Sequence, residues 1–252
     1  MMSYYRQPSI SFGPPLTRMV KYLIIFTSVV FVLTFILGSL PFPAARLYFW
    51  IYPNFFFGLR PAAIIHYPFF IWQPVTYLFL HGGWFHIFFN LFALWMFGAD
   101  LERLWGPRQF LFYFFLTGIG AGLFDVMLQP NATIPTIGNS GAVYGLLMAY
   151  GLLFPDRPIL LWLVIPIKAK WFVVIMGLIE FVSSLSGSGT GISHVAHLGG
   201  MLFGFLYLRG SGLPYRWQLR YQDWRRARLR RKFEIYMSDK EKKKDDAGRW
   251  IN

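Results

Sequence analysis

The chain has no cysteine and little charge over most of its length. Among its 252 residues Cys is absent, which excludes disulfides, thiol nucleophiles and thiolate metal sites. Only 14% of the residues are charged and 56% are hydrophobic, whereas an ordinary soluble domain is about 25% charged. Residues 1–208 contain only ten Lys or Arg and five Asp or Glu. So few charges cannot cover a water-soluble globule, and the composition therefore indicates an integral membrane protein.

The rest of the charge lies in the last 44 residues, which contain fourteen Lys or Arg and six Asp or Glu. Because this tail carries eight of the thirteen net positive charges, the net charge does not indicate a nucleic-acid-binding protein. Residues 225–232 interleave basic with apolar side chains, a pattern that anionic lipids attract by about 1 kcal/mol per basic residue. We expect the tail to lie on the inner membrane surface and to bind no nucleic acid. A disordered tail that only sets the topology is the alternative.

Six apolar stretches approach the length of a transmembrane helix, which needs about 20 residues to cross a core of about 30 Å. The sequence predicts an all-α, polytopic bundle with an N-terminal segment at 1–21, a six-span domain at 22–208 and a tail at 209–252. The N-terminal segment has no small-residue cleavage motif after the first span, so we interpret that span as an anchor. The predicted spans are residues 22–37, 84–97 with an apolar extension at 75–80, 110–128, 140–154, 171–181 with a lead-in at 159–165, and 194–208.

The distribution of basic residues sets the expected orientation. With the N-terminus inside, the inner segments carry 22 Lys or Arg, and the outer segments carry only Arg46 and Arg60. Such an excess is typical of cytoplasmic segments, so we expect both termini in the cytoplasm and the protein in the inner membrane of a bacterium. The first outer loop, residues 38–73, is rich in aromatic residues and is expected to lie in the interface plane. An aromatic belt of no special purpose is the alternative.

Polar residues on three predicted spans reach a similar depth. Counted at about 1.5 Å per residue from the charged residue at the inner end of each span, His86, Ser140 and His197 lie about 21, 24 and 18 Å away. Polar side chains within a membrane are costly and usually functional. Hydrogen bonding between helices is the alternative for any one of them, but the common depth favours a shared site.

Ser140 lies in the sequence Gly138-Asn-Ser-Gly141, where an outer loop turns into the fourth span. Free backbone N–H groups and the positive end of the helix dipole surround a serine in this position, as a nucleophile with an oxyanion intermediate requires. Without Cys, its base must be His194 or His197. Gly200 and Gly204 share a helical face with His197 and can pack against Gly141 and Gly145, which favours His197.

The second span offers hydrogen-bond donors for the same site. His86 and Asn90 lie one helical turn apart on one face and can both donate to an oxyanion. His81, at the mouth of this span, is interpreted as a structural hydrogen-bonding residue. Two carboxylates, Asp125 and Glu180, could each orient a histidine, but we interpret them as groups of a helix interface or gate.

At these residues the chain resembles the rhomboid family of intramembrane serine proteases. The matching motifs are His81-Gly-Gly-Trp-Phe-His-Ile-Phe-Phe-Asn90, Gly138-Asn-Ser-Gly141 with Tyr144, and Ala196-His-Leu-Gly-Gly200. The resemblance implies a dyad of Ser140 as nucleophile and His197 as general base, with Tyr144 stacked on His197. It also implies oxyanion stabilisation by His86, Asn90 and the Ser140 backbone. It further implies single-span membrane-protein substrates with helix-breaking residues, cut near the outer surface, and neither metal nor organic cofactor.

Two other functions are compatible with the same residues. A non-catalytic membrane chaperone or binding protein could use the same scaffold. A multi-histidine metal site could instead use four of the histidines as ligands, although this leaves the Gly138–Gly141 motif unexplained. The four histidines are His81, His86, His194 and His197.

Overall fold

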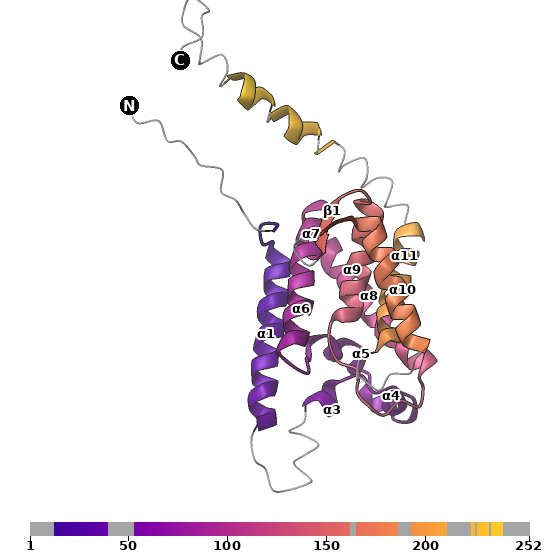
Figure 1. The fold of residues 1–252 in the computed structure, drawn as a ribbon. Helices are drawn as coiled ribbons and strands as arrows, with labels where there is room; N and C mark the ends of the chain where they lie inside the picture. Colours follow the sequence, from indigo (N-terminus) through magenta and orange to yellow (C-terminus); the bar gives the residue numbers. More distant parts are fainter. Residues whose placement is uncertain are drawn as a thin grey trace, which may run out of the picture.

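The computed structural model describes residues 13–39, 53–161, 165–185, 193–210, 223–224, 226–231 and 233–238. The first twelve residues, the aromatic residues at 42–52 of the outer loop, and the solvated end of the tail lie outside the described residues. The described part of the tail is helical and is drawn in yellow in Figure 1.

The described chain is mostly helical. Its elements, in order, are α1 (Arg18–Ser39), α3 (Pro53–Phe57), α4 (Pro61–His66), the short 3-10 helix η1 (Pro68–Phe70), α5 (Gln73–Thr76), η2 (Tyr77–Phe79), α6 (Trp84–Ala93), the π-helical turn η3 (Leu94–Gly98), α7 (Ala99–Trp105), α8 (Pro107–Leu128), α9 (Ser140–Leu153), β1 (Pro158–Leu161), β2 (Ile165–Lys168), α10 (Ala169–Leu185) and α11 (His194–Gly210). The start of α1, the hairpin of β1 and β2 and the end of α11 lie at one end of the bundle, and α3 and α4 lie at the other (Figure 1).

Three helical stretches in the described residues are long and apolar enough to cross a membrane. They are Arg18–Ile36, Trp84–Trp105 and Pro107–Leu128, and they make this a membrane protein. The three later helices are shorter, with 14 residues in α9 and 17 each in α10 and α11. The count of six spans therefore stays a prediction.

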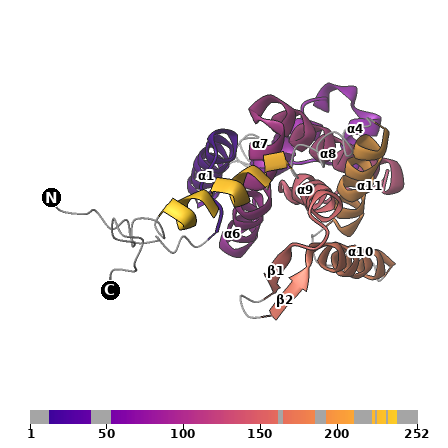
Figure 2. The same cartoon turned by 90° about the horizontal axis from the view of Figure 1, so that it is seen from above.

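The short helix α9 is the centre of the bundle. It contacts α8, α10 and α11 and also reaches α6 and α7, and Figure 2 shows it surrounded by these helices. Nearly all of its side chains are buried, so its apolar residues pack against protein on every side rather than against lipid. A helix enclosed in this way can begin below the membrane surface, and its first residue is Ser140.

Small residues allow α9 and α11 to approach closely. A Cβ atom added at Gly200 would lie 1.9 Å from the carbonyl oxygen of Gly141, and one at Gly204 would lie 3.3 Å from that of Gly145. The glycine faces expected from the spacing therefore meet at two successive turns. The backbones are in contact at the point from which Ser140 and His197 extend.

Two segments differ from the sequence expectation. The apolar extension at 75–80 is not part of the second span, because α5 and η2 are separate short helices and Leu80 and Gly83 have extended backbone before α6 begins. The lead-in to the fifth span is a β-hairpin in which Ile159 pairs with Ile167, so the protein is not strictly all-α. Lys170 and Lys168 contact Asp156 beside this hairpin and, chiefly through the hydrogen bond from Lys170, lower the pKa of its carboxyl.

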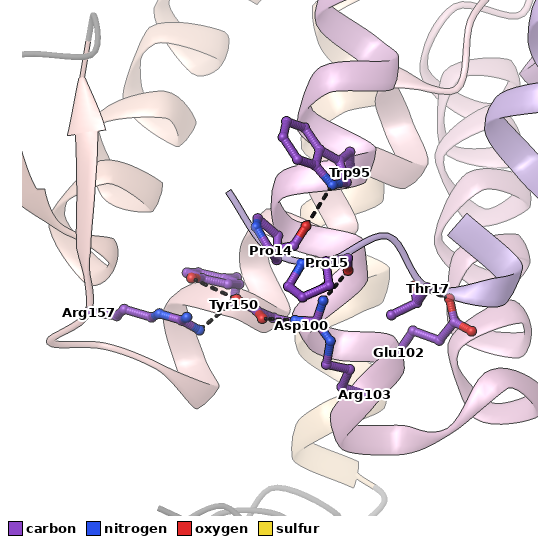
Figure 3. Close-up of polar contacts among 9 residues, drawn as sticks. All are labelled: Pro14, Pro15, Thr17, Trp95, Asp100, Glu102, Arg103, Tyr150 and Arg157. Carbon is purple, nitrogen blue, oxygen red and sulfur yellow. Dashed lines mark hydrogen bonds and ion pairs between the residues drawn. The ribbon is translucent and has the colours of Figure 1, made fainter. Parts of the chain in front are cut away.

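A carboxylate of α7 holds the start of α1 (Figure 3). Glu102 accepts hydrogen bonds from the Thr17 hydroxyl at 2.5 Å and from the backbone N–H groups of Met19 and Val20 at 2.9 Å. The first turn of a helix leaves its N–H groups without partners inside the helix, and α1 has no acidic residue of its own there. Glu102 supplies the missing acceptor from another element and so fixes the first helix to the bundle.

Candidate active site

Ser140 and His197 lie in contact at the outer end of the bundle in the predicted orientation. The Oγ atom of Ser140, the first residue of α9, is 2.7 Å from Nε2 of His197 on α11. The imidazole is 7% exposed, and its ring stacks on that of Tyr144, with centroids 4.4 Å apart and an angle of 14° between the planes. The stacking leaves the ring little freedom to turn, so Nε2 stays directed at the serine hydroxyl.

The other nitrogen of His197 faces a buried carboxylate. Nδ1 lies 2.9 Å from Oε2 of Glu180 on α10, at an angle that misses an aligned hydrogen bond. Nδ1 of His194 lies 2.6 Å from the same oxygen, and the hydroxyl of Tyr144 donates to the other oxygen, Oε1. One glutamate therefore joins α9, α10 and α11 beside the Ser140–His197 pair.

Two donors from α6 approach the turn that precedes Ser140. Gly138 has φ +109°, and a Cβ atom there would lie 2.7 Å from Nε2 of His86 and 3.7 Å from Nδ2 of Asn90. The backbone N–H of Gly82 donates to Nδ1 of His86 at 3.4 Å, which leaves the proton of that imidazole on Nε2. Asn90 uses one amide hydrogen on the carbonyl oxygen of His86 at 3.0 Å and has a second one to donate.

His81 lies beside this group and packs against His86. It is 3% exposed, and its ring lies edge-on to that of His86 with centroids 4.9 Å apart. Within the described residues its ring nitrogens and the buried amide of Asn139 make no hydrogen bond of strict geometry, but the Asn139 side chain and the Phe79 backbone lie close enough to interact with its imidazole. The structural hydrogen bond expected for His81 therefore stays a prediction, with these two groups as its candidate partners.

Asp125 makes no ion pair or hydrogen bond with a histidine in the described residues, and it connects the outer ends of the helices. Its carboxylate accepts hydrogen bonds from Ser193 at 2.7 Å, from Thr136 at 2.8 Å and from Gln129 at 3.0 Å. These residues belong to α8, to the loop before α9 and to the start of α11. The interface role expected for Asp125 agrees with these contacts.

The residues that could hold a metal ion differ from the predicted set of four histidines. In the described chain, ligand atoms of Glu180, His194 and His197 all lie within 4.8 Å of one another. The other two, His81 and His86, contact each other instead. One carboxylate and two imidazoles suit zinc, but in this arrangement His197 is already in contact with Ser140.

A comparison with protein families decides the classification. The Rhomboid domain model matches residues 68–211, which is more than half of the chain. The chain belongs to the rhomboid family. The resemblance to this family that was inferred from the motifs is therefore confirmed. The proteases of this family are serine hydrolases that act within membranes. The matched region includes all the residues of the site described above.

Individual rhomboid proteins are similar over this same part. The mitochondrial Rhomboid protein 1 of Saccharomyces cerevisiae is 31% identical over 140 residues, which cover 51% of this chain and 38% of that protein. The Rhomboid protease GluP of Bacillus subtilis is 30% identical over 148 residues, which cover 57% of this chain and 26% of that protein. A third relative, the Inactive RHOMBOID-like protein 8 of Arabidopsis thaliana, is 39% identical over 79 residues, which cover 31% of this chain and 22% of that protein. The chain spans less than two fifths of each relative's length.

Glu180 is the residue beside the Ser140–His197 pair whose position the sequence did not indicate, since it was considered as a partner for a histidine but interpreted as an interface or gate group. It lies 14 residues before His194 and 17 before His197, and the intervening sequence at 186–192, Ser-Gly-Ser-Gly-Thr-Gly-Ile, has no apolar periodicity from which a relation between the two helices could be predicted. The available signal was the residue type itself. Within α10 it is the one acidic residue among apolar neighbours, and a carboxylate in such a helix needs a partner.

Proposed function

We propose that this rhomboid protein is an active serine endopeptidase that cleaves the transmembrane segments of other membrane proteins. The contact that carries the proposal is the 2.7 Å distance between Ser140 Oγ and His197 Nε2. A nucleophile and its base within hydrogen-bonding reach, with the base oriented by further groups, are the recurring arrangement of serine hydrolases.

In the proposed reaction, His197 Nε2 takes the proton from Ser140 Oγ as this oxygen bonds to the carbonyl carbon of the scissile peptide. The imidazolium then gives the proton to the departing amine, and the acyl-enzyme remains on Ser140. A water molecule, deprotonated by the same nitrogen, releases the acyl group and restores the serine. The two steps in which Nε2 accepts a proton need neutral His197 with its proton on Nδ1, which is the tautomer that Glu180 at 2.9 Å favours.

The oxyanion of each tetrahedral intermediate would be stabilised from α6 and from the start of α9. The donors are Nε2–H of His86, the free amide hydrogen of Asn90 and the backbone N–H of Ser140, whose helix also directs its positive end toward this point. Gly138 and Gly141 allow the close packing around this turn, because a Cβ atom would meet His86 at the first position and Ala121 at the second. Loss of one such donor in a serine protease costs about 10²- to 10³-fold in kcat.

The substrate class follows from where the site lies. With 14 residues, α9 is about 21 Å long, shorter than the core of about 30 Å. If its inner end lies at the cytoplasmic surface, Ser140 lies below the outer surface. A substrate must unwind there to expose a peptide bond, which favours spans with helix-breaking residues. We propose that both termini are cytoplasmic and that the protein lies in the inner membrane, with its basic tail against anionic lipids.

The test is cleavage of a single-span reporter by the purified protein in detergent, with Ser140→Ala and His197→Ala compared with the wild type. We expect cleavage by the wild type and a loss of at least about 10³-fold in both variants, because dyad members act as a unit. A control variant, His66→Ala, removes a histidine of α4 outside the site and should cleave normally. Wild-type cleavage that persists in Ser140→Ala would exclude the dyad.

The same measurement separates the alternative functions. A chaperone would leave the reporter intact and keep its biological effect in Ser140→Ala. A metal site at Glu180, His194 and His197 would make activity sensitive to a chelator and restorable by zinc. The protease proposal expects cleavage that is unaffected by the chelator.

A further inference from the structure

The charged group nearest to the proposed base comes from a different helix. Glu180 of α10 is 5% exposed, and its Oε2 atom lies 2.9 Å from Nδ1 of His197. The opposite nitrogen of that ring is the atom in contact with Ser140. Serine, imidazole and carboxylate therefore follow one another in a line that crosses α9, α11 and α10.

We propose that Glu180 is a positioning residue for His197 and completes a Ser140–His197–Glu180 triad. The proposal rests on the proposed protease function and names a further residue of the same site. A carboxylate at Nδ1 keeps the proton on that nitrogen, so Nε2 is free to accept the serine proton. It also stabilises the imidazolium that forms when the proton moves, as the aspartate of the serine-protease triad does.

The surroundings of Glu180 suit an ionised carboxylate. A buried charge without partners is strongly unfavourable, and this one has three donors within reach, from Tyr144, His194 and His197. The negative charge is thus present before the reaction begins. The positive charge on His197 then develops next to a group that does not have to reorganise.

The alternative explanation is that Glu180 only stabilises the packing of α10 against α9 and α11 and has no role in the reaction. The buried residues of α10 are Ala169, Val173 and Glu180, so this glutamate is the buried contact of the second half of the helix. The neighbouring apolar side chains Leu178 and Ile179 are more than half exposed. The contact with His194, at 2.6 Å, would serve such packing equally well. The two roles differ in whether the charge of Glu180 matters to the reaction at Ser140.

The experiment compares Glu180→Gln with Glu180→Asp and with the matched control His194→Gln. Glu180→Gln keeps the size of the side chain and one of its two acceptor oxygens, but it removes the charge and replaces the other oxygen by an NH2 donor. His194→Gln weakens the packing contact and leaves the carboxylate facing His197. Each protein is measured for its thermal unfolding temperature, its reporter cleavage between pH 5 and pH 9, and its rate of labelling by a fluorophosphonate. The label forms an Oγ–P bond at Ser140 and releases fluoride, and the proton passes to His197, so it reports activation of the serine without a substrate.

We expect Glu180→Gln to lower kcat and the labelling rate together by at least about 10²-fold, since loss of an orienting carboxylate costs about 10⁴-fold in known serine proteases. KM should change little. The acidic side of the pH profile should move to lower pH, because the imidazolium loses a neighbouring negative charge. Glu180→Asp should recover part of the activity, and His194→Gln should lose much less than Glu180→Gln at a similar unfolding temperature.

Other groups also act on His197 and set the background for the pH profile. Its stacking partner Tyr144 comes from α9, and His194 shares its helix and lies with its ring 6.1 Å away. His86 and Asp125 interact with it electrostatically from α6 and α8. His86 and Asp125 keep their contacts in Glu180→Gln, and His194→Gln, which retains the carboxylate, shows how much of any displaced acidic limb comes from His194.

Two results would overturn the triad. One is a Glu180→Gln protein that labels and cleaves like the wild type. The other is a parallel loss in Glu180→Gln and His194→Gln that follows their unfolding temperatures, with an unmoved pH profile. If the folded wild type itself neither labels nor cleaves, the failure belongs to the proposed protease function.

Discussion

At the scale of single residues, each side chain near Ser140 has a second contact that decides which of its atoms faces the serine. Glu180 lies 2.9 Å from Nδ1 of His197, and Tyr144 stacks on its ring. The backbone N–H of Gly82 occupies Nδ1 of His86. In the proposed mechanism, the imidazole on α11 therefore presents an acceptor and the imidazole on α6 presents a donor. One residue type serves two opposite purposes because its other nitrogen is bound differently.

The approach of the α6 donors, His86 and Asn90, to the turn before Ser140 requires that residue 138 has no side chain. We therefore expect Gly138→Ala to abolish most of the activity. Its φ of +109° is unfavourable for any side chain, and the new Cβ would displace the imidazole of His86, only 2.7 Å away. Loss of one oxyanion donor predicts a fall of about 10²- to 10³-fold in kcat. Reporter cleavage and the unfolding temperature, measured together, separate this effect from instability.

Gly106 provides the matched control for this substitution. It also has a positive φ, +82°, but a Cβ atom there would meet nothing within 4 Å. Gly106→Ala therefore adds the backbone strain alone, about 1–3 kcal/mol, and should lower stability while kcat is retained. Equal losses of kcat in the two variants would show that strain, and not contact with His86, accounts for the effect of Gly138→Ala.

Ser140 and His197 could be predicted from the sequence because local motifs surround them, whereas the position of Glu180 could not, because it depends on tertiary packing. The flanking glycines at 138 and 141 and the glycine face of the last helix pointed to Ser140 and His197, which the structure places 2.7 Å apart. Glu180 was interpreted as an interface or gate group, since no spacing related it to either histidine. Its position depends on how α10 packs against α11, which the order of residues does not encode locally.

At the scale of elements, the contact between α9 and α11 holds the dyad together, and Gly200→Ala tests it. A methyl group at this position would lie 1.9 Å from the backbone oxygen of Gly141, so the helices must move apart beside Ser140. Overpacking of this kind costs about 1–3 kcal/mol of unfolding free energy. A displacement of 1 Å at a reacting pair can cost about 10²-fold in rate, so we expect a loss of activity beyond the loss of folded protein.

The control lies on the same helix. Gly210, the last residue of α11, has open space around the position of a Cβ atom, so Gly210→Ala should leave both the unfolding temperature and the rate of cleavage unchanged. Gly200→Ala should differ from it in both. If the two substitutions behave alike, the close approach of α9 and α11 does not limit the position of the dyad.

The elements that the sequence misassigned are those where apolar runs are short. Residues 75–80 and 159–165 are apolar enough to extend a span, but periodicity cannot distinguish a short buried helix or strand from part of a longer helix. In the structure, Pro74 lies in the first turn of α5, and Pro158 and Pro166 lie in the hairpin. Proline is tolerated at such positions and disfavoured within a helix, and this signal was available in the sequence.

At the scale of the whole molecule, the charged contacts of Asp100 and Glu102 lie at one end of the helix bundle and the proposed active site lies toward the other. The start of α1 and the end of α11 lie at the same end of the bundle (Figure 1), where Glu102 and Asp100 bind basic and backbone groups. The proposed active site lies toward the other end, where α9 begins. The basic residues counted in the sequence predict that the first of these ends faces the cytoplasm.

The absence of cysteine makes this orientation directly testable, because any thiol introduced into the chain is the only one present. Thr133, in the loop before α9, and Ser238, in the helical tail, are both exposed. We expect a membrane-impermeant maleimide to label Thr133→Cys in intact cells and Ser238→Cys only after the cells are opened, since inner segments carry the excess of Lys and Arg. The wild type, which has no thiol, is the control for background. Labelling of Ser238→Cys in intact cells would place the tail outside, and the proposed cut near the outer surface would then have to lie near the cytoplasmic surface.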